Sequence, residues 1–243
     1  MIQLFKLKFL TQNGFRIGGK VEQNLLTQLR IDEDTFIIPA SSWKGTFRRV
    51  SEIVAGNKDH FDGHKNGNAD EAKEFAKKDK VFRKIAESHE MIKIREDGEI
   101  EVNKENEENE NEFVKLYKEF NCPIERLYGG EYFAGAITIS DTVIKAEIDQ
   151  RTHVTIDRKS RKGIENHLFS EEIVNVSSVE VFVVVRGEFE LWKNTLKFLR
   201  DLGYFIGAGK SRGIGYIKLD EKESMFAEVD NLNKKPKFMS LVL

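Results

Sequence analysis

The 243-residue sequence contains one cysteine, Cys122, and only three prolines. A single cysteine excludes an intrachain disulfide and a zinc site built from four cysteines. No apolar stretch is long enough to span a bilayer, and the opening residues, MIQLFKLKFLTQNGF, lack the zones of a signal peptide. We therefore expect a globular cytoplasmic protein, and its 40% of hydrophobic residues suffice for a substantial core.

A large net charge is missing as well, since the formal net charge is −2 at pH 7. That average argues against a non-specific coat for nucleic acids, but segregated charges can still produce a basic face. The segment 101–112, EVNKENEENENE, is strongly acidic. A basic cluster with one acid, Asp157, follows within residues 151–162: Arg151, Arg158, Lys159, Arg161 and Lys162.

Hydrophobic periodicity predicts a mixed α+β fold. Core strands are expected at 2–10, 134–148, 179–189 and 214–219, with helices at about 41–56 and 191–205. The order strand, helix, strand, strand, helix, strand is the ferredoxin-like βαββαβ plan, which RNA-recognition motifs share. Ser41 or Ser42 is expected to cap the first helix.

Two segments interrupt this plan. Residues 57–134 are predicted to be an insertion without a hydrophobic core of its own, with a charged helix at about 70–88 and a disordered or highly solvated loop at 101–112. Residues 150–175 form a polar, basic projection between two core strands. In the insertion, His60, Asp62 and His64 have a spacing that zinc accepts, but surface-loop residues are the commoner explanation, and we predict no metal site.

The stretch GAGKSRGIG, residues 207–215, suggests a phosphate-binding loop but does not fit one. A Walker A loop needs glycine where Tyr204 stands, and a dinucleotide fingerprint needs glycine where Arg212 stands. Both motifs also require a strand before a helix, whereas here the helix comes first. The glycines permit close backbone approach, and Lys210 and Arg212 add cationic donors.

Four stretches together resemble one protein family. IPASSWKGTFRRV (38–50) resembles the "IP-x-SS-x-KG-x-x-R" signature of the RAMP superfamily, and GAGKSRGIGYIKL (207–219) resembles its C-terminal glycine-rich loop. HVTIDRKSRKGIENHLFSEEIV (153–174) is similar to a segment of the backbone-type subunits of type III (Csm/Cmr-like) CRISPR-Cas effector complexes. LYGGEYFAGAITISD (127–141) fits the family pattern before the second core strand. The resemblance covers most of the chain, apart from 57–120 and the tail.

The resemblance implies a single RAMP domain over 1–243, in which 150–175 is the thumb-like β-hairpin. It implies a structural subunit that binds the guide RNA (crRNA) of a type III ribonucleoprotein and recognises foreign RNA in antiviral defence. The expected partners are guide RNA, complementary target RNA and other RAMP subunits, without a membrane. The alternative is a RAMP endoribonuclease acting on guide precursor or target RNA. A general RNA-recognition motif is disfavoured because its aromatic signature is absent.

Cations, helix-start serines and glycines make up the predicted RNA contacts, because cations and N–H groups hold phosphates and glycines allow close approach. Ile156, Ile164, Leu168 and Phe169 are candidates for wedging against bases, or equally for a small core of the hairpin. The predicted RNA-binding residues are Gly18, Gly19, Ser41, Ser42, Lys44, Arg48, Arg49, Arg158, Lys159, Arg161, Lys162, Gly207, Gly209, Lys210, Arg212 and Gly213.

Whether the chain cleaves RNA is left open by the sequence. In cleaving members of the family, an aspartate lies between the first glycine turn and the IP-x-SS motif, a position that Asn24 or Leu25 occupies here. Asp32 and Asp34 are the fallback catalytic candidates, with Glu22 behind them, although such acids are usually turn residues. No cofactor is expected for RNA binding, and a divalent metal (Mg or Mn) only if the chain cuts RNA.

Overall fold

The computed structural model describes residues 1–22, 25–56, 67–103, 107–229 and 235–243. The chain divides into two compact units, which are described separately. Unit 1 consists of Met1–Val50, Ile139–Val184 and Lys193–Leu243, and unit 2 of Ser51–Thr138 and Val185–Trp192. In the part of the chain that the structure describes, no helix is both long and apolar enough to cross a membrane.

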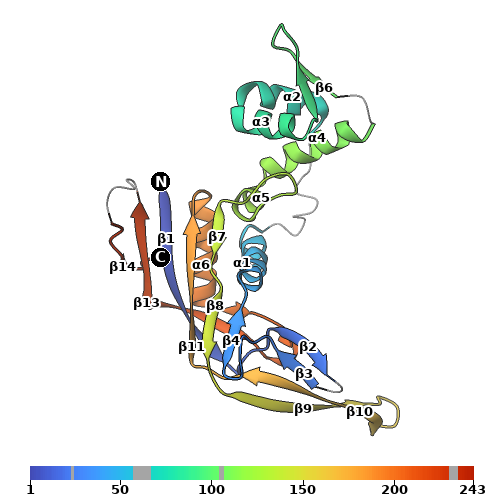
Figure 1. Ribbon diagram of the computed structural model, residues 1–243, viewed down its shortest axis with the longest axis vertical. Coiled ribbons are helices and arrows are strands. Elements are labelled where there is room, and N and C mark those ends of the chain that lie inside the picture. Colours follow the sequence, from blue (N-terminus) through green and yellow to red (C-terminus); the bar gives the residue numbers. More distant parts are fainter. Residues whose placement is uncertain (23–24, 57–66, 104–106, 230–234) are drawn as a thin grey trace. The chain divides into compact units, whose positions relative to one another are not determined.

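The main sheet of unit 1 is built around the N-terminal strand β1 (Ile2–Gln12). β1 pairs antiparallel with β13 (Tyr216–Val229), so the two ends of the chain lie in neighbouring strands. The strand order is β12-β13-β1-β11-β7, and β14 pairs with β13 at the side (Figure 1). The remaining strands are β12 (Tyr204–Phe205), β11 (Ser178–Val185), β7 (Ile137–Ile139) and β14 (Met239–Ser240).

One face of β1 supplies the core of unit 1. Strand alternation places Phe5, Leu7 and Phe9 on the same face, and all three are buried. Helix α1 (Ala40–Val54) packs against this face, since the Phe9 ring lies 5.2 Å from Trp43 and 6.0 Å from Phe47. Helix α6 (Phe189–Asp201) contributes further fully buried side chains to unit 1, Leu196 and Leu199.

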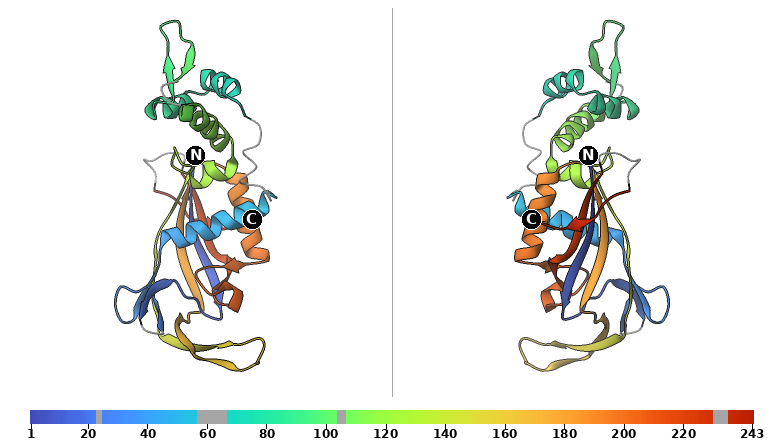
Figure 2. Two further views of the ribbon diagram at one scale, coloured as in Figure 1. Left: turned by 90° about the vertical axis from the view of Figure 1, so that its right-hand side faces the viewer. Right: turned by 90° about the vertical axis from the view of Figure 1, so that its left-hand side faces the viewer.

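A second sheet of unit 1 carries a long hairpin. Its strand order is β2-β3-β10-β9, where β9 and β10 form the antiparallel hairpin and β3 runs parallel to β10. The far end of the hairpin projects beyond β2 and β3 (Figures 1 and 2). The strands are β2 (Gly18–Glu22), β3 (Leu25–Gln28), β9 (Ile148–Ile156) and β10 (Gly163–Val174); β4 (Thr35–Ile38) pairs separately with β8 (Thr142–Lys145).

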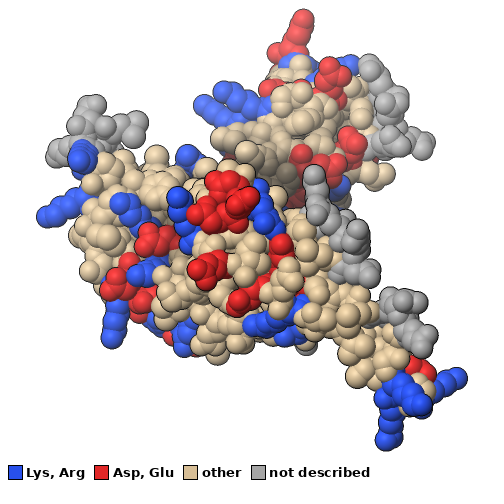
Figure 3. Space-filling model, turned by 60° about the horizontal axis from the view of Figure 1, so that its bottom comes forward, with Lys and Arg blue, Asp and Glu red and all other residues tan. Residues whose placement is uncertain are grey.

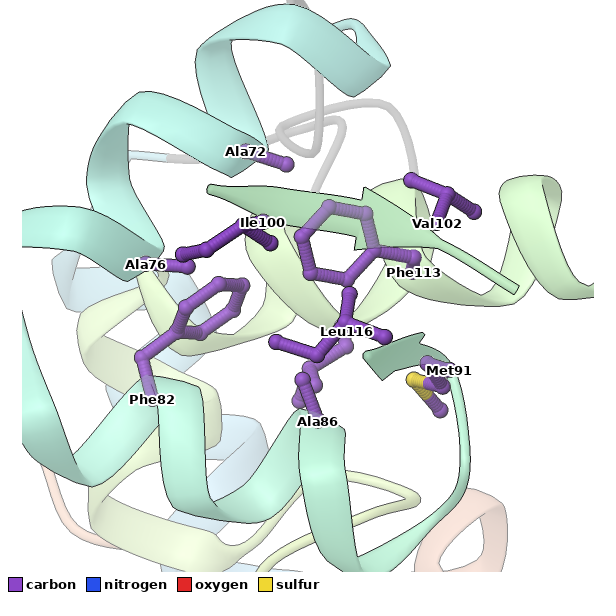
Figure 4. Close-up of a cluster of buried hydrophobic side chains, with 10 residues drawn as sticks. Ala72, Ala76, Phe82, Ala86, Met91, Ile100, Val102, Phe113 and Leu116 are labelled. Carbon is purple, nitrogen blue, oxygen red and sulfur yellow. The ribbon is translucent and has the colours of Figure 1, made fainter. Parts of the chain in front are cut away.

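Unit 2 has a hydrophobic cluster of its own (Figure 4). Small side chains, Ala72, Ala76 and Ala86, let the helices approach Phe82 and Phe113 closely. The elements around the cluster are α2 (Ala69–Lys78), α3 (Lys80–Ser88), β5 (Ile92–Ile94), β6 (Ile100–Val102) and α4 (Glu107–Phe120), and α5 (Pro123–Tyr128) follows.

The structure corrects two expectations for the insertion. The expectation that it lacks a hydrophobic core is wrong, because alanines and scattered aromatic residues bury themselves among the charged positions. The expectation of a disordered or highly solvated loop at 101–112 is also wrong for the described part of that segment. Residues 101–102 end β6, and residues 107–112 begin α4, which the buried Phe113 anchors. The charged helix at 70–88 is two helices, α2 and α3, separated by Asp79.

Three boundaries in unit 1 differ from those expected. The strand at 134–148 is divided among β7, β8 and the start of β9. The helix expected at 191–205 ends at Asp201, and the last strand continues to Val229. Neither Ser41 nor Ser42 caps α1, because the helix starts at Ala40 and the Asp141 carboxylate accepts the Ala40 N–H at 2.7 Å.

Candidate nucleic-acid interface

The tip of the β9–β10 hairpin, residues 157–162, is a turn organised by one carboxylate. The Asp157 side chain accepts hydrogen bonds from the N–H groups of Lys159 (3.0 Å) and Ser160 (3.2 Å). The backbone of Asp157 bonds to both Arg161 and Lys162. The hydrogen bonds from Ser160 and then Lys159 lower the pKa of Asp157. Its ionised carboxylate therefore stabilises the turn itself.

Four cations surround this turn. Arg158, Lys159, Arg161 and Lys162 are all exposed. Figure 3 shows Lys and Arg side chains gathered at the end of a projection from the molecule, and the hairpin is the projecting element of unit 1. With the Asp157 carboxylate used internally, the hairpin tip offers positive charge to an external anion.

The hairpin shaft carries exposed apolar side chains. Val154 and Leu168 are direct cross-strand partners and are 52% and 56% exposed. Ile156 and Ile164, nearer the tip, are exposed too. The sequence left open whether such residues form a small core, and at these positions they do not. On the other face, Phe169 stacks on His153 with ring centroids 5.1 Å apart.

The hairpin root, which we define as Arg16, His153, Glu171 and Arg212, converges on one buried carboxylate. Glu171 is fully buried, and its Oε2 accepts from Arg16 Nε at 3.1 Å and Arg212 Nη2 at 3.0 Å. Its Oε1 lies 2.6 Å from His153 Nε2. The guanidinium of Arg212 also lies over the Phe169 ring, at 5.9 Å. These contacts join the hairpin to the glycine loop and to the segment after β1.

Two opposing effects act on the pKa of Glu171. Burial alone would raise the pKa, because desolvation disfavours the charged form. Hydrogen bonds and charge from Arg212, followed by those from His153, outweigh burial, and the pKa lies below its ordinary value. Glu171 is therefore ionised at neutral pH and holds the surrounding cations in place.

The adjacent Glu172 supports the same root from the other face of β10. Its Oε2 accepts the Gln28 N–H at 2.8 Å and pairs with Arg30. The Gln28 side chain in turn accepts the Ile17 N–H at 2.8 Å. A depression of about 710 Å³ opens beside these residues, lined by Gly18, Gly19, Leu25, Thr27, Gln28, Leu29, Arg30 and Glu172.

The glycine loop packs closely against its own chain. A Cβ on Gly207 would lie 2.3 Å from the Arg16 carbonyl oxygen, and one on Gly215 would lie 2.0 Å from that of Ile206. Gly209 and Gly213 flank a short 3-10 helix, Lys210–Arg212, and both have left-handed backbones. Space is open only beside Gly213, where an added Cβ meets nothing within 4 Å. Close approach at Gly207 and Gly215 is thus intramolecular.

The predicted cations of the first helix lie along α1. Lys44 and Arg49 are exposed and Arg48 is half-buried. Ser41 is exposed at the helix start, where Asp141 already occupies the Ala40 N–H. Gly18 is exposed on β2, whereas Gly19 faces its own chain, since a Cβ there would lie 2.7 Å from the Thr27 carbonyl oxygen.

The acidic catalytic candidates lie in the turn before β4. Asp32 and Asp34 are both exposed. The Asp34 N–H donates to Asp32 Oδ1 at 3.3 Å, and the Thr35 hydroxyl donates to Asp34 Oδ1 at 2.9 Å. Hydrogen bonding, chiefly from Thr35, lowers the pKa of Asp32, so this carboxylate is ionised at neutral pH. The side chain of Glu22 and the whole of Asn24 lie outside the described residues.

The described residues bring no metal-binding cluster together. Within 1–22, 25–56, 67–103, 107–229 and 235–243, no group of three or more His, Cys, Asp and Glu side chains could hold a metal ion. His60, Asp62 and His64, whose spacing resembles a zinc site, lie outside these ranges.

Sequence reasoning missed the hairpin root. Arg16, Glu171 and Glu172 were not among the predicted site residues, although Glu171 receives cations from residues 155 and 41 positions away. The one available signal was the pair of adjacent glutamates, Glu171 and Glu172, in an otherwise basic and apolar segment. A glutamate that is buried in a strand requires a cationic partner, which has to come from elsewhere in the chain.

These observations define a class: an α+β protein with a projecting hairpin whose tip presents cations and whose root is fixed by buried ion pairs. The sequence profile of the RAMP superfamily matches residues 6–218, which is most of the chain. The protein belongs to the RAMP superfamily. None of the individually curated proteins compared with it matches. Membership is consistent with a CRISPR-associated role in RNA binding.

Proposed function

We propose that this chain is a structural subunit of a type III CRISPR-Cas ribonucleoprotein of the Csm/Cmr-like class, where it binds the guide RNA. One observation carries the proposal: the β9–β10 hairpin presents four cations at its tip and apolar side chains along its shaft. In this function the hairpin is the thumb, and the complex recognises foreign RNA in antiviral defence.

The hairpin has two kinds of group that RNA requires. Arg158, Lys159, Arg161 and Lys162 fit phosphates, which dominate affinity for nucleic acids. Val154 and Leu168, exposed on one face, fit the flat apolar surface of a base that has been separated from its neighbour. Exposure of such side chains costs free energy unless a partner covers them, and a guide–target duplex crossed by the thumb would do so.

The fold supports the same proposal. Along the chain, β1, α1, β7, β11, α6 and β13 follow one another in the order of a ferredoxin-like βαββαβ core. In the sheet these strands lie in the order β13-β1-β11-β7, which puts the first and last strands side by side. We assign the main sheet of unit 1 to a ferredoxin-like core of the kind found in RNA-recognition motifs.

Other predicted contacts complete the proposed RNA path. Lys44, Arg48 and Arg49 on α1 and Lys210 beside the glycine loop would hold guide phosphates. Gly213, with open space beside it, is the glycine at which another molecule can approach the backbone. The partners in this proposal are the guide RNA, complementary target RNA and further RAMP subunits in the cytoplasm, and RNA binding needs no cofactor.

The test is RNA binding by the full-length protein. A labelled synthetic guide with repeat and spacer sequence is titrated at several salt concentrations. Replacing Arg158, Lys159, Arg161 and Lys162 by Ala should weaken binding at least about tenfold and reduce the salt slope by up to about 3, given roughly 0.7 per phosphate contact on a single strand. The matched control replaces four other exposed cations by Ala: Lys193, Lys222, Lys235 and Lys237.

If the hairpin variant and the control bind the guide RNA with equal affinity, the hairpin is not an RNA contact and the assignment of the thumb is wrong. Purification from its source should also yield a complex with further RAMP subunits and a bound RNA of defined length. An RNA-free monomer without affinity for the guide would overturn the whole proposal.

The second candidate is a RAMP endoribonuclease, favoured by the exposed and ionised Asp32. Asp32 and Asp34 would share a divalent ion (Mg or Mn) with the RNA phosphate, because two carboxylates alone leave most of its coordination open. Asp32→Ala and Asp34→Ala should then abolish target cutting by the assembled complex in the presence of that ion. Unchanged cutting by both variants would exclude these residues as catalysts.

A further inference from the structure

Unit 2 carries a second basic surface, which the proposed function does not use. We call it the elbow: Lys77 and Lys78 at the end of α2, and Lys80, Arg83 and Lys84 in α3. All four lysines are exposed and Arg83 is half-buried. Ala76, Phe82 and Ala86 of the same two helices pack into the core of unit 2 (Figure 4). The exposed elbow lysines therefore lie on the outer side of these helices.

Helix electrostatics explain only half of this surface. Lys77 and Lys78 lie in the last turn of α2, where the helix dipole favours cations. Lys80 is the first residue of α3, whose first turn contains no acid, so it meets the positive end of that helix dipole. Lys80 and Lys84 are also like charges at i and i+4, a spacing that destabilises a helix. Helix electrostatics therefore account for Lys77 and Lys78 but not for Lys80.

Among the described residues, an ion pair neutralises one cation of the elbow. Lys77 pairs with Glu74 at 2.9 Å. Within the described ranges, Lys78, Lys80, Arg83 and Lys84 have no ion-pair partner within 4 Å. The acid between the two helices, Asp79, uses its carboxylate to accept the N–H groups of Val81 and Phe82. The charges of the elbow are left for a partner.

Four acids of unit 2 lie together outside α2 and α3, whose own acids are Asp70, Glu71, Glu74 and Glu87. Glu96, Asp97, Glu99 and Glu101 are all exposed and lie on or between β5 and β6. An anionic partner is attracted to the exposed cations of the elbow, while Glu96 and Asp97 disfavour its approach to the turn between β5 and β6.

We propose that the elbow binds the phosphate backbone of RNA, as a second contact surface separate from the hairpin tip. Lysine is depleted in protein–protein interfaces, which need apolar or aromatic anchors. Among the elbow positions and those between them, Val81 is the only large apolar side chain that is exposed. Phosphate contacts, by contrast, are made by lysine and arginine without apolar anchors. The composition of the elbow fits a nucleic-acid backbone and carries no feature that reads bases.

The choice of RNA rather than another polyanion rests on the proposed function. The experiment is therefore designed so that failure of the elbow inference can be told apart from failure of the proposed function. The full-length chain is titrated with a labelled 40-nucleotide single-stranded RNA of random sequence at several salt concentrations. The elbow variant carries Lys78→Glu, Lys80→Glu and Lys84→Glu. The matched control carries Lys193→Glu, Lys222→Glu and Lys237→Glu, three exposed lysines of unit 1.

The elbow variant should bind at least about tenfold more weakly at low salt, with a salt slope smaller by about 2, for three lost contacts at roughly 0.7 each. Its melting temperature should change little, because Lys80→Glu gains favourable dipole energy at the start of α3 while Lys78→Glu loses it in the last turn of α2. The control should keep both the affinity and the slope. Loss of binding with an unchanged or higher melting temperature identifies contact rather than misfolding.

Two results would overturn the inference. One is an elbow variant whose RNA affinity and salt slope equal those of the control while the wild type binds. The other is an elbow variant that keeps its RNA affinity but loses self-association in sedimentation, which assigns the elbow to an acidic protein surface. A wild type that binds no RNA would overturn the proposed function as well. If the hairpin variant loses binding and the elbow variant does not, only the elbow inference is overturned.

Discussion

The two ends of the β9–β10 hairpin hold similar charges in opposite ways. At the root, Arg16 and Arg212 are paired with the fully buried Glu171. At the tip, Arg158 and Lys159 are exposed around an acid whose hydrogen bonds go to the turn. The number of arginines in a segment therefore does not locate an RNA contact. The partner of each cation decides whether its charge stabilises the fold or is available to a ligand.

The largest effect is expected at the root. Glu171→Gln leaves two arginines and His153 without their shared anion, and should lower the free energy of unfolding by about 3 kcal/mol, the lower end for a broken buried pair. The lower end applies because Arg212 is 38% exposed. Urea denaturation measures the change. Glu180→Gln, at an exposed position on β11, is the control and should be neutral; equal stability of the two variants would refute the buried hub.

Acid should narrow the difference between wild type and Glu171→Gln. Because the folded state lowers the pKa of Glu171, its contribution is complete above the ordinary value of 4.5 and is lost as pH falls through the lowered pKa. The difference in unfolding free energy should stay constant from pH 7 to about 5.5 and shrink below the ordinary pKa. A difference that is the same at pH 3.5 and pH 7 would show that the charge of Glu171 is not the cause.

Two glycines of the loop that contains Arg212 allow a further comparison beside the hairpin root. Gly215→Ala places a Cβ 2.0 Å from the Ile206 carbonyl oxygen at a φ of 84°. Gly213→Ala has a similar φ, 78°, in open space. We expect losses in unfolding free energy of at least about 2 kcal/mol at Gly215 and about 1 kcal/mol at Gly213. Chemical denaturation of both variants tests this order, which equal losses would contradict.

The smallest effect on stability is expected at the tip. Replacing Arg158, Lys159, Arg161 and Lys162 by Ala should change the free energy of unfolding by less than about 0.5 kcal/mol, because exposed substitutions away from packing rarely do more. The same variant is expected to lose RNA affinity. A loss of stability comparable to that of Glu171→Gln would mean that the tip cations serve the fold, and the contrast between the two ends would fail.

Local patterns in the sequence predicted the hairpin tip but not the root. A basic run without apolar periodicity identifies a projection, and Arg158 and Lys162 needed no other part of the chain. Glu171, in contrast, resembles any polar residue of a strand, and only the folded chain brings Arg16 and Arg212 to it from 155 and 41 positions away.

The same difference explains the other corrections. Ala72, Ala76 and Ala86 are too small to stand out in a charged segment, yet their size is what lets unit 2 bury Phe82. The carboxylate at the start of α1 comes from Asp141, 101 residues away, and no local capping rule finds it. Helices and strands could therefore be predicted where the sequence pattern is local. Contacts between residues that are distant in the chain could not be predicted.

The pairing of β1 with β13 sets the order in which the chain becomes structured during synthesis. The partners of Ile2–Gln12 begin at Tyr216, about 200 residues later, so at roughly 5 to 20 residues per second the first strand waits roughly 10 to 40 s for them. The buried residues of the hydrophobic cluster in unit 2 lie closer together in the chain, between Ala72 and Leu116, and wait less for one another. During translation, the apolar face of β1 thus stays without its partner strand and is exposed to aggregation.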